Sequence, residues 1–145
     1  MFEKVAFKRG HLSEMLNQKS NSDNVEFFKT VDFDVLEKLS SITGMINGKP
    51  VVCGGIVPYW NGRGYLWTVF DENSKEYFVP IFRGIKSFLN DVAPFYNRLE
   101  IAVPCNFEIG IRRAKMLGFI TECERAIKFL PNGEDCSLMV YLGGR

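Results

Sequence analysis

The spacing of apolar residues changes several times along the chain, and each change predicts a new element of secondary structure. Residues 4–8 alternate polar and apolar side chains, as a strand does, and residues 11–18 then place apolar side chains at helical spacing. Residues 17–24 are polar, which indicates a surface loop. Asp32 is a suitable N-cap for a second helix that begins near Phe33.

A meander of three strands is predicted next. Residues 42–46 and 49–57 have the spacing and β-branched side chains of strands, and Asn47-Gly48 between them is the dipeptide typical of a tight hairpin turn. After a second turn, residues 65–70 are nearly all apolar. An apolar run of this kind is typical of a strand in the middle of a sheet, buried on both faces.

A long amphipathic helix follows the meander, because apolar side chains recur at helical spacing over about residues 75–93. Either Ser74 caps this helix or Pro80 occupies its first turn, where a proline is tolerated. Residues 99–103 form the next predicted strand. The helix therefore connects two buried strands, which indicates that part of the sheet is parallel.

The last third of the chain predicts one more helix and a closing hairpin. Asn106 can cap a helix that stops at Gly118, and residues 119–130 and 136–142 are the strands of the hairpin. The predicted order is β-α-α-β-β-β-α-β-α-β-β. It corresponds to an α/β fold with one mixed sheet and helices on both faces.

The hairpin also predicts the relation between two thiols. A turn centred on Asn132-Gly133 places Cys136 opposite about Phe129, and Cys123 opposite about Leu142. In that register the two sulfur atoms are too far apart to form a disulfide.

Composition and charge narrow the function classes. A length of 145 residues predicts a single domain over residues 1–145, and the net charge of +1 gives no general attraction for nucleic acid or an anionic membrane. No apolar run approaches a membrane span, and the first residues lack a secretory signal. We therefore expect a cytoplasmic protein with reduced thiols.

Metal and histidine chemistry are not predicted. No pair among Cys53, Cys105, Cys123 and Cys136 has the spacing of a zinc motif, and the single histidine, His11, is distant in sequence. We expect neither a metal site nor a histidine-based catalytic triad.

The element order and one motif resemble the GCN5-related N-acetyltransferase (GNAT) family. The motif is Asn106-Phe-Glu-Ile-Gly-Ile-Arg-Arg-Ala-Lys-Met-Leu-Gly118-Phe119, which is similar to the family's N-x-x-A-x-x-x-Y-x-x-x-G-F segment. The resemblance extends from about Ile42 to Leu142. Within the family, the strand containing Cys53-Gly54-Gly55 and the closing hairpin resemble small GNAT-like proteins of tailed bacteriophages, which include an internal virion protein.

The resemblance implies that acetyl-CoA is the cofactor. In the family, the asparagine contacts the pantetheine arm, the fourth strand pairs with that arm through its backbone, and the start of the crossover helix holds phosphate. The implied cofactor-binding residues are Thr68, Val69, Phe70, Ser74, Lys75 and Asn106. Each also has a purely structural interpretation, as sheet core, solvated charge or helix cap.

The resemblance also implies an acceptor site at the hairpin tip that carries Tyr59, Trp60 and Arg63. Ordinary edge packing is the alternative. Cys105 ends the strand beside the implied thioester site, or is simply a small buried hydrophobe.

Two departures from the family pattern bear on activity. The cofactor loop of the family is rich in glycine, whereas residues 71–76 are Asp-Glu-Asn-Ser-Lys-Glu. The later Phe82-Arg83-Gly84 imitates the loop but leaves too short a helix behind it. The tyrosine that many members use as a general acid is replaced by Ala114, which cannot donate a proton.

These observations leave two hypotheses. The first is a GNAT-like N-acyltransferase, phage-encoded, that joins an acyl group to a small-molecule or protein amine mainly by proximity. The second is a GNAT-fold binding or internal virion protein without turnover, acting on a host or virion partner. No catalytic residue is assigned, and Glu72 and Glu100 are candidate bases by residue type alone.

Overall fold

The computed structural model describes residues 1–21, 25 and 28–143, so most of the polar stretch at residues 22–27 lies outside the described residues. Within these residues seven strands form one sheet in the order β1-β2-β3-β4-β5-β7-β6. The strands are β1 (Phe2–Ala6), β2 (Ser41–Ile46), β3 (Lys49–Trp60), β4 (Arg63–Phe70), β5 (Arg98–Pro104), β6 (Ile120–Ala126) and β7 (Cys136–Leu142). The helices are α1 (Arg9–Leu16), α3 (Phe33–Lys38), α4 (Phe78–Val92) and α5 (Glu108–Leu117). Short 3-10 helices are η1 (Lys19–Asn21), η2 (Ser74–Tyr77) and η3 (Ala93–Phe95).

The predicted α/β order and the mixed sheet are confirmed. The β1–β2 and β2–β3 pairs are antiparallel. The strands β4 and β5, which precede and follow the crossover helix α4 in the sequence, pair in parallel. The first strand was expected at residues 4–8 but ends at Ala6, because α1 already begins at Arg9. The backbone N–H of Arg9 donates to Glu37 Oε2 of α3 at 2.9 Å, and this satisfies one of the unpaired donors at the helix start.

The described chain forms two compact units that share β3 and β4. Unit 1 contains Met1–Val57 and Trp67–Leu89, and unit 2 contains Pro58–Leu66 and Asn90–Arg145. The expectation of a single domain remains a prediction.

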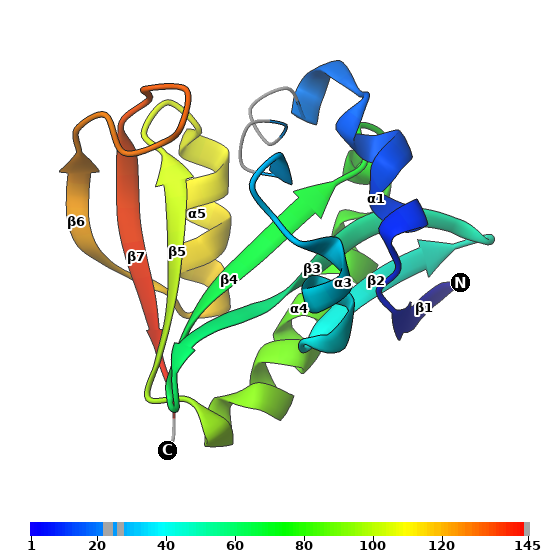
Figure 1. Ribbon diagram of the computed structural model, residues 1–145, viewed down its shortest axis with the longest axis horizontal. Helices are drawn as coiled ribbons and strands as arrows, with labels where there is room; N and C mark the ends of the chain where they lie inside the picture. The colour runs from blue at the N-terminus through cyan, green and yellow to red at the C-terminus, as the bar shows by residue number, and fades with distance from the viewer. Residues whose placement is uncertain (22–24, 26–27, 144–145) are drawn as a thin grey trace. The chain divides into compact units, whose positions relative to one another are not determined.

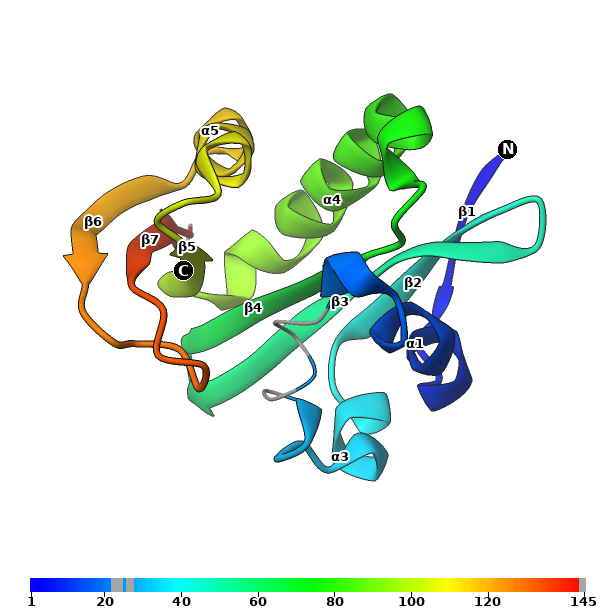
Figure 2. The same cartoon turned by 90° about the horizontal axis from the view of Figure 1, so that it is seen from above.

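Helices lie on both faces of the strands in unit 1 (Figure 2). Figure 2 shows α1 and α3 on one face of β3 and β4, with α4 on the other. On the α4 side, Ile81 packs against Ile46, Val51 and Val52. On the α1 side, the ring of Trp67 meets two phenylalanines edge to face. Burial on both faces explains why β2 and β3 are so rich in apolar side chains.

The turn chemistry of the meander follows the sequence. Asn47 and Gly48 have φ values of 52° and 76°, as a type I′ hairpin turn requires, so the predicted turn is confirmed. Asp32 caps α3 as expected, since its side chain accepts hydrogen bonds from the backbone N–H groups of Asp34 and Val35. Pro80 lies in the first turn of α4, whereas Ser74 opens the separate helix η2.

Unit 2 is built on β5, β7 and β6, and α5 lies behind β5 (Figure 1). The helix ends at Gly118, whose φ of 109° gives the left-handed cap that the sequence predicts. The parallel ladder joins Arg63–Tyr65 of β4 to Arg98–Glu100 of β5. Phe119 then packs its ring on Tyr141 of β7, with the ring centroids 5.5 Å apart.

The predicted register of the closing hairpin is wrong. Cys136 lies opposite Ala126, and Cys123 lies opposite Leu138. The reason is that β6 stops at Ala126, so the connection to β7 is longer than a tight turn. The Asp135 carboxylate holds this connection, accepting hydrogen bonds from the Lys128 N–H at 2.9 Å and from Arg125 at 2.7 Å. No local hydropathy signal marks that contact.

Among the described residues, no helix combines the length and apolar character needed to cross a membrane.

His11 forms the end of a chain of hydrogen bonds that runs into the core of unit 1. The backbone N–H of Lys8 donates to His11 Nδ1 at 3.2 Å, so Nδ1 carries no proton and the neutral ring is protonated on Nε2. Thr43 Oγ1 lies 2.8 Å from the same nitrogen and must therefore donate to it. Cys53 Sγ, 3.4 Å from Thr43 Oγ1, then donates to the hydroxyl.

The first prediction concerns pH. Burial, with the nearby charge of Lys8, lowers the pKa of His11 from its ordinary value of 6.5. Between that value and the lower folded pKa the unfolded chain binds more protons, so acidification through this window reduces the free energy of unfolding. We expect urea midpoints to fall between about pH 7.5 and 5.5 in the wild type. His11→Gln keeps a side chain that can accept from Lys8 N–H but does not titrate, so its pH dependence should be weaker. Equal slopes in both proteins would refute this assignment.

The second prediction concerns close packing of β2 and β3. A Cβ at Gly55 would lie 2.4 Å from the carbonyl oxygen of Ser40 and 2.7 Å from the Cα of Ser41. Because these are backbone atoms that cannot rotate away, Gly55→Ala should destabilise the protein by about 1–3 kcal/mol in urea unfolding. Gly10→Ala is the matched control, since a Cβ there meets nothing within 4 Å and lies in α1. It should be neutral or stabilising by up to about 1 kcal/mol.

Candidate functional site

The C-terminal half of β4 is buried on one face only. Trp67 and Val69 are buried, but Thr68 and Phe70 are exposed, and successive strand side chains point to opposite faces. The expectation that this whole run is buried on both faces is therefore wrong at its end. The exposed face belongs to the part of β4 that the family resemblance assigns to a cofactor, and it presents a hydroxyl and an aromatic ring.

A buried carboxylate fixes the chain where β4 ends. Asp71 is only 4% exposed, and its Oδ1 accepts a hydrogen bond from Gln18 Nε2 at 2.7 Å. Gln18 also accepts through Oε1 from the backbone N–H of Glu72 at 2.9 Å. We name this pair of contacts the Gln18–Asp71 clasp. It joins the segment just after α1 to the first residues of the expected phosphate-binding segment.

The segment from Asp71 to Glu76 forms a turn that uses its own N–H groups. The N–H of Asn73 donates to Asp71 Oδ2 at 3.0 Å, and the N–H of Ser74 donates to the Asp71 carbonyl at 2.9 Å. The N–H of Glu76 donates to the Asn73 carbonyl at 3.3 Å, within η2. The N–H of Glu72 donates to Gln18, as described above. Four backbone N–H groups of this segment therefore already have protein partners.

Asn21 adds a second link from η1 to β4. Its Nδ2 donates to the Phe70 carbonyl and to the Met15 carbonyl, each at 2.9 Å, and the residue is 4% exposed. Gln18 and Asn21 were missed because they lie in a polar stretch that predicts a surface loop. Hydropathy cannot distinguish a solvated amide from a buried amide whose hydrogen bonds are satisfied.

The glycine-containing stretch Phe82-Arg83-Gly84 lies inside α4, which begins at Phe78, and not before the helix start, where the family resemblance places the cofactor loop. Gly84 has a packing role instead, because a Cβ there would lie 2.7 Å from the ring of Phe2. Absence of a side chain lets β1 and α4 approach each other.

Asn106 does not cap α5. The N-cap is Phe107, without a side-chain hydrogen bond, and Asn106 lies one residue earlier in an exposed turn. The cap interpretation is therefore wrong, which leaves the amide of Asn106 outside the helix end. Ala114 is buried within α5, at the position where many GNAT proteins have tyrosine. Thr68, Val69, Phe70, Ser74 and Lys75 belong to unit 1, and Asn106 belongs to unit 2.

The expected acceptor residues form a stacked cluster in unit 2. The Arg63 guanidinium carbon lies 4.6 Å from the ring centroid of Tyr59 and 4.5 Å from that of Trp60. The two rings remain 53% and 62% exposed, so each keeps surface for a ligand. The structure therefore brings Tyr59, Trp60 and Arg63 together, as the sequence expectation requires.

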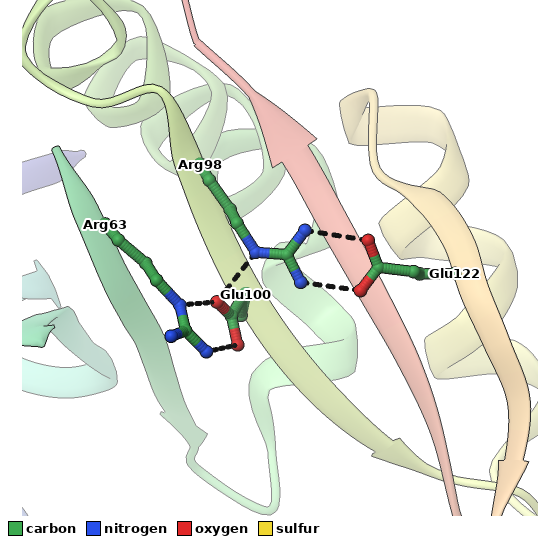
Figure 3. A network of polar contacts seen from close by, with 4 residues as sticks. All are labelled: Arg63, Arg98, Glu100 and Glu122. Atoms are coloured by element: carbon green, nitrogen blue, oxygen red, sulfur yellow. Dashed lines mark hydrogen bonds and ion pairs between the residues drawn. The ribbon is translucent and has the colours of Figure 1, made fainter.

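Arg63 begins a chain of alternating charges across the sheet (Figure 3). It forms a bidentate pair with Glu100, whose Oε2 also accepts from Arg98 Nε at 2.8 Å. Arg98 reaches on to Glu122 of β6, with Nη1 2.7 Å from Oε2. Two guanidinium groups and two carboxylates thus neutralise one another. Arg98 and Glu100 are two residues apart in β5 and share a face, whereas the contact with Arg63 of β4 is not evident from sequence spacing.

This network argues against Glu100 as a catalytic base. Hydrogen bonds from Arg63, and then from Arg98, hold the pKa of Glu100 below its ordinary value although the group is partly buried. A general base works best with a pKa near the operating pH, and this shift moves the carboxylate in the opposite direction. Within the described residues, no group of three or more His, Cys, Asp or Glu side chains could hold a metal ion.

Solved structures identify the fold. Ard1 from Thermoplasma volcanium matches with a TM-score of 0.74 at 12% sequence identity, covering 99% of each chain. An acetyltransferase of the GNAT family from Streptococcus pneumoniae matches with a TM-score of 0.64 at 14% identity, covering 99% of this chain and 100% of that one. The fold is the GNAT fold.

A third similar protein was solved with ligands. Spermidine N-acetyltransferase from Vibrio cholerae, in complex with CoA and spermine, matches with a TM-score of 0.65 at 15% identity, covering 98% of this chain and 95% of that one. Models of protein families and curated protein sequences gave no match. The GNAT fold expected from the sequence is confirmed, and the resemblance to phage proteins remains a prediction.

The third prediction concerns the thiols, all four of which are free. Burial raises the pKa of Cys53 and of Cys136 to about 11, and both are 0% exposed. Cys105 and Cys123 are only half-buried. In the folded protein Cys105 and Cys123 should therefore react with a disulfide reagent at least about 100-fold faster than Cys53 and Cys136. After unfolding without reductant all four should react, and a missing pair would reveal a disulfide.

Proposed function

We propose that the protein is an N-acyltransferase that moves an acyl group from a pantetheine thioester to an amine. The observation that carries the proposal is the GNAT fold with an exposed end of β4, where Thr68 and Phe70 remain uncovered. Backbone groups of Thr68, Val69 and Phe70 are assigned to the pantetheine arm, whose amides can pair with a strand as another strand would.

The residues in unit 2 have supporting roles in this proposal. Asn106 contributes its exposed amide to the donor, and Tyr59, Trp60 and Arg63 bind the amine acceptor. The V. cholerae protein was solved with spermine, so polyamines are the first acceptors to test. With Ala114 in place of a tyrosine acid, rate acceleration comes mainly from holding donor and acceptor together.

Weak binding of the CoA nucleotide is part of this proposal, and the hydrogen bonds of residues 71–76 support it. The N–H groups of Glu72, Asn73 and Ser74 have protein partners, and the segment contains the carboxylates of Asp71, Glu72 and Glu76. A diphosphate there would meet negative charge rather than unpaired donors.

A second candidate function follows from the same observations. The N–H groups of residues 72–74 already have protein partners, Ala114 cannot act as an acid, and Glu100 is paired with arginines. These features favour a GNAT-fold binding protein without turnover, with a host or virion protein as partner. The phage origin in that hypothesis rests on the sequence resemblance alone.

The fourth prediction tests the acyltransferase. Purified protein is incubated with acetyl-CoA or S-acetyl-pantetheine and a panel of amines, and acetylated products are detected by mass spectrometry. Asn106→Ala should weaken donor binding about 3- to 10-fold, the loss of one hydrogen bond, while the urea midpoint stays unchanged. Asn90→Ala, an exposed asparagine at the end of α4, is the matched control and should leave binding unaltered. Binding without any acetylated amine favours the second candidate.

A further inference from the structure

We infer that this protein recognises its thioester donor through the pantetheine arm alone and makes no favourable contact with the nucleotide diphosphate. The inference rests on the proposed function and names its donor class as S-acyl-pantetheine, of which acyl-CoA is one carrier. It comes from the hydrogen bonds and charges at the end of β4.

A diphosphate is held by several backbone N–H groups that point to one place and have no other partner. Here the N–H of Glu72 is bound by Gln18, and those of Asn73 and Ser74 are bound by Asp71. Each contact must be broken before the group can reach phosphate. The donors therefore contribute little net binding, because every hydrogen bond gained replaces one lost.

The clasp also makes rearrangement of this turn costly. The Asp71 carboxylate is buried and receives Gln18 Nε2 on Oδ1 and Asn73 N–H on Oδ2, so releasing the turn would leave one oxygen of a buried carboxylate without its donor. Only a local unfolding of the junction between α1 and β4 would free the three N–H groups together.

The start of α4 is a weaker alternative than an ordinary helix start. Its first residue, Phe78, directly continues η2, and Pro80 in the first turn has no N–H to donate. Within residues 71–76 the only cation is Lys75, against three carboxylates. The local charge therefore repels a diphosphate, most strongly at low ionic strength.

The pantetheine arm meets a different surface. It is uncharged, and β4 presents Thr68 and Phe70 on a face that is exposed at its end. Asn21 Nδ2 already donates to the Phe70 carbonyl oxygen. That oxygen has a second lone pair, which can accept a hydrogen bond from an amide of the pantetheine arm. Affinity for the donor is thus set by strand-like pairing and apolar contact, both of which are insensitive to salt.

The fifth prediction compares two donors by calorimetry on the purified protein. Acetyl-CoA and S-acetyl-pantetheine should bind with dissociation constants within about threefold of each other, and both weaker than about 100 μM. At low salt acetyl-CoA should be the weaker ligand, and the difference should shrink as salt is added. Acetyl-CoA binding more than tenfold tighter, or CoA that stays bound through purification, would overturn the inference and leave the proposed function standing. If neither donor binds, the proposed function fails.

A charge variant sharpens the comparison. The double variant Glu72→Gln/Glu76→Gln removes two exposed carboxylates from the turn without touching the clasp. It should strengthen acetyl-CoA binding about two- to fivefold at low salt and leave S-acetyl-pantetheine unchanged. Glu3→Gln/Glu14→Gln makes the same change in net charge at exposed sites in β1 and α1, and should affect neither donor. A tenfold or larger gain in the first variant would show that the N–H groups are available to phosphate after all, against the inference.

Discussion

The Asp71 carboxylate is buried where β4 ends, and a buried carboxylate must be hydrogen-bonded or it destabilises the fold. Gln18 from the end of α1 meets that requirement on one side, and the turn's own N–H of Asn73 meets it on the other. Removing either partner would leave a buried acceptor short of its donors, at a cost of about 1–3 kcal/mol. The position of α1, the shape of the turn and the chemistry of the segment before α4 thus all depend on one carboxylate.

Unit 2 solves the same electrostatic problem by pairing charges. Glu100 forms ion pairs with Arg63 and Arg98, and Arg98 also pairs with Glu122. The two positive and two negative charges of this network on the sheet face add up to a net charge of zero. The stacking of Arg63 on Tyr59 and Trp60 holds the guanidinium in one plane. Such a face cannot attract a charged acceptor by net charge. If the proposed amine acceptor binds there, it would depend on the exposed aromatic rings, which can contact a cation directly.

The fold could be predicted from the sequence because its determinants are local. Asn47-Gly48, Asp32 and Gly118 each need only their own backbone angles or neighbouring N–H groups. The errors involve contacts between distant residues. Asp135 lengthens the hairpin connection through Arg125 and Lys128, and Gln18 reaches across 53 positions to Asp71. Neither contact leaves a periodic signal in the sequence. The hairpin register and the hydrogen bonds of residues 71–74 could therefore not be predicted without the structure.

For the candidate site, sequence reasoning found the residue types and not the state of their hydrogen bonds. The missing glycines at residues 71–76 indicate a poor phosphate site because side chains hinder close approach. The structure supplies a different reason. A glycine at Asn73 would still donate its N–H to Asp71, since that bond needs only the backbone of residue 73 and the carboxylate of residue 71. Restoring glycines would therefore not restore a phosphate cradle while the clasp remains. In the donor class proposed above, the deciding feature is therefore the partners that these N–H groups already have, more than the missing glycines.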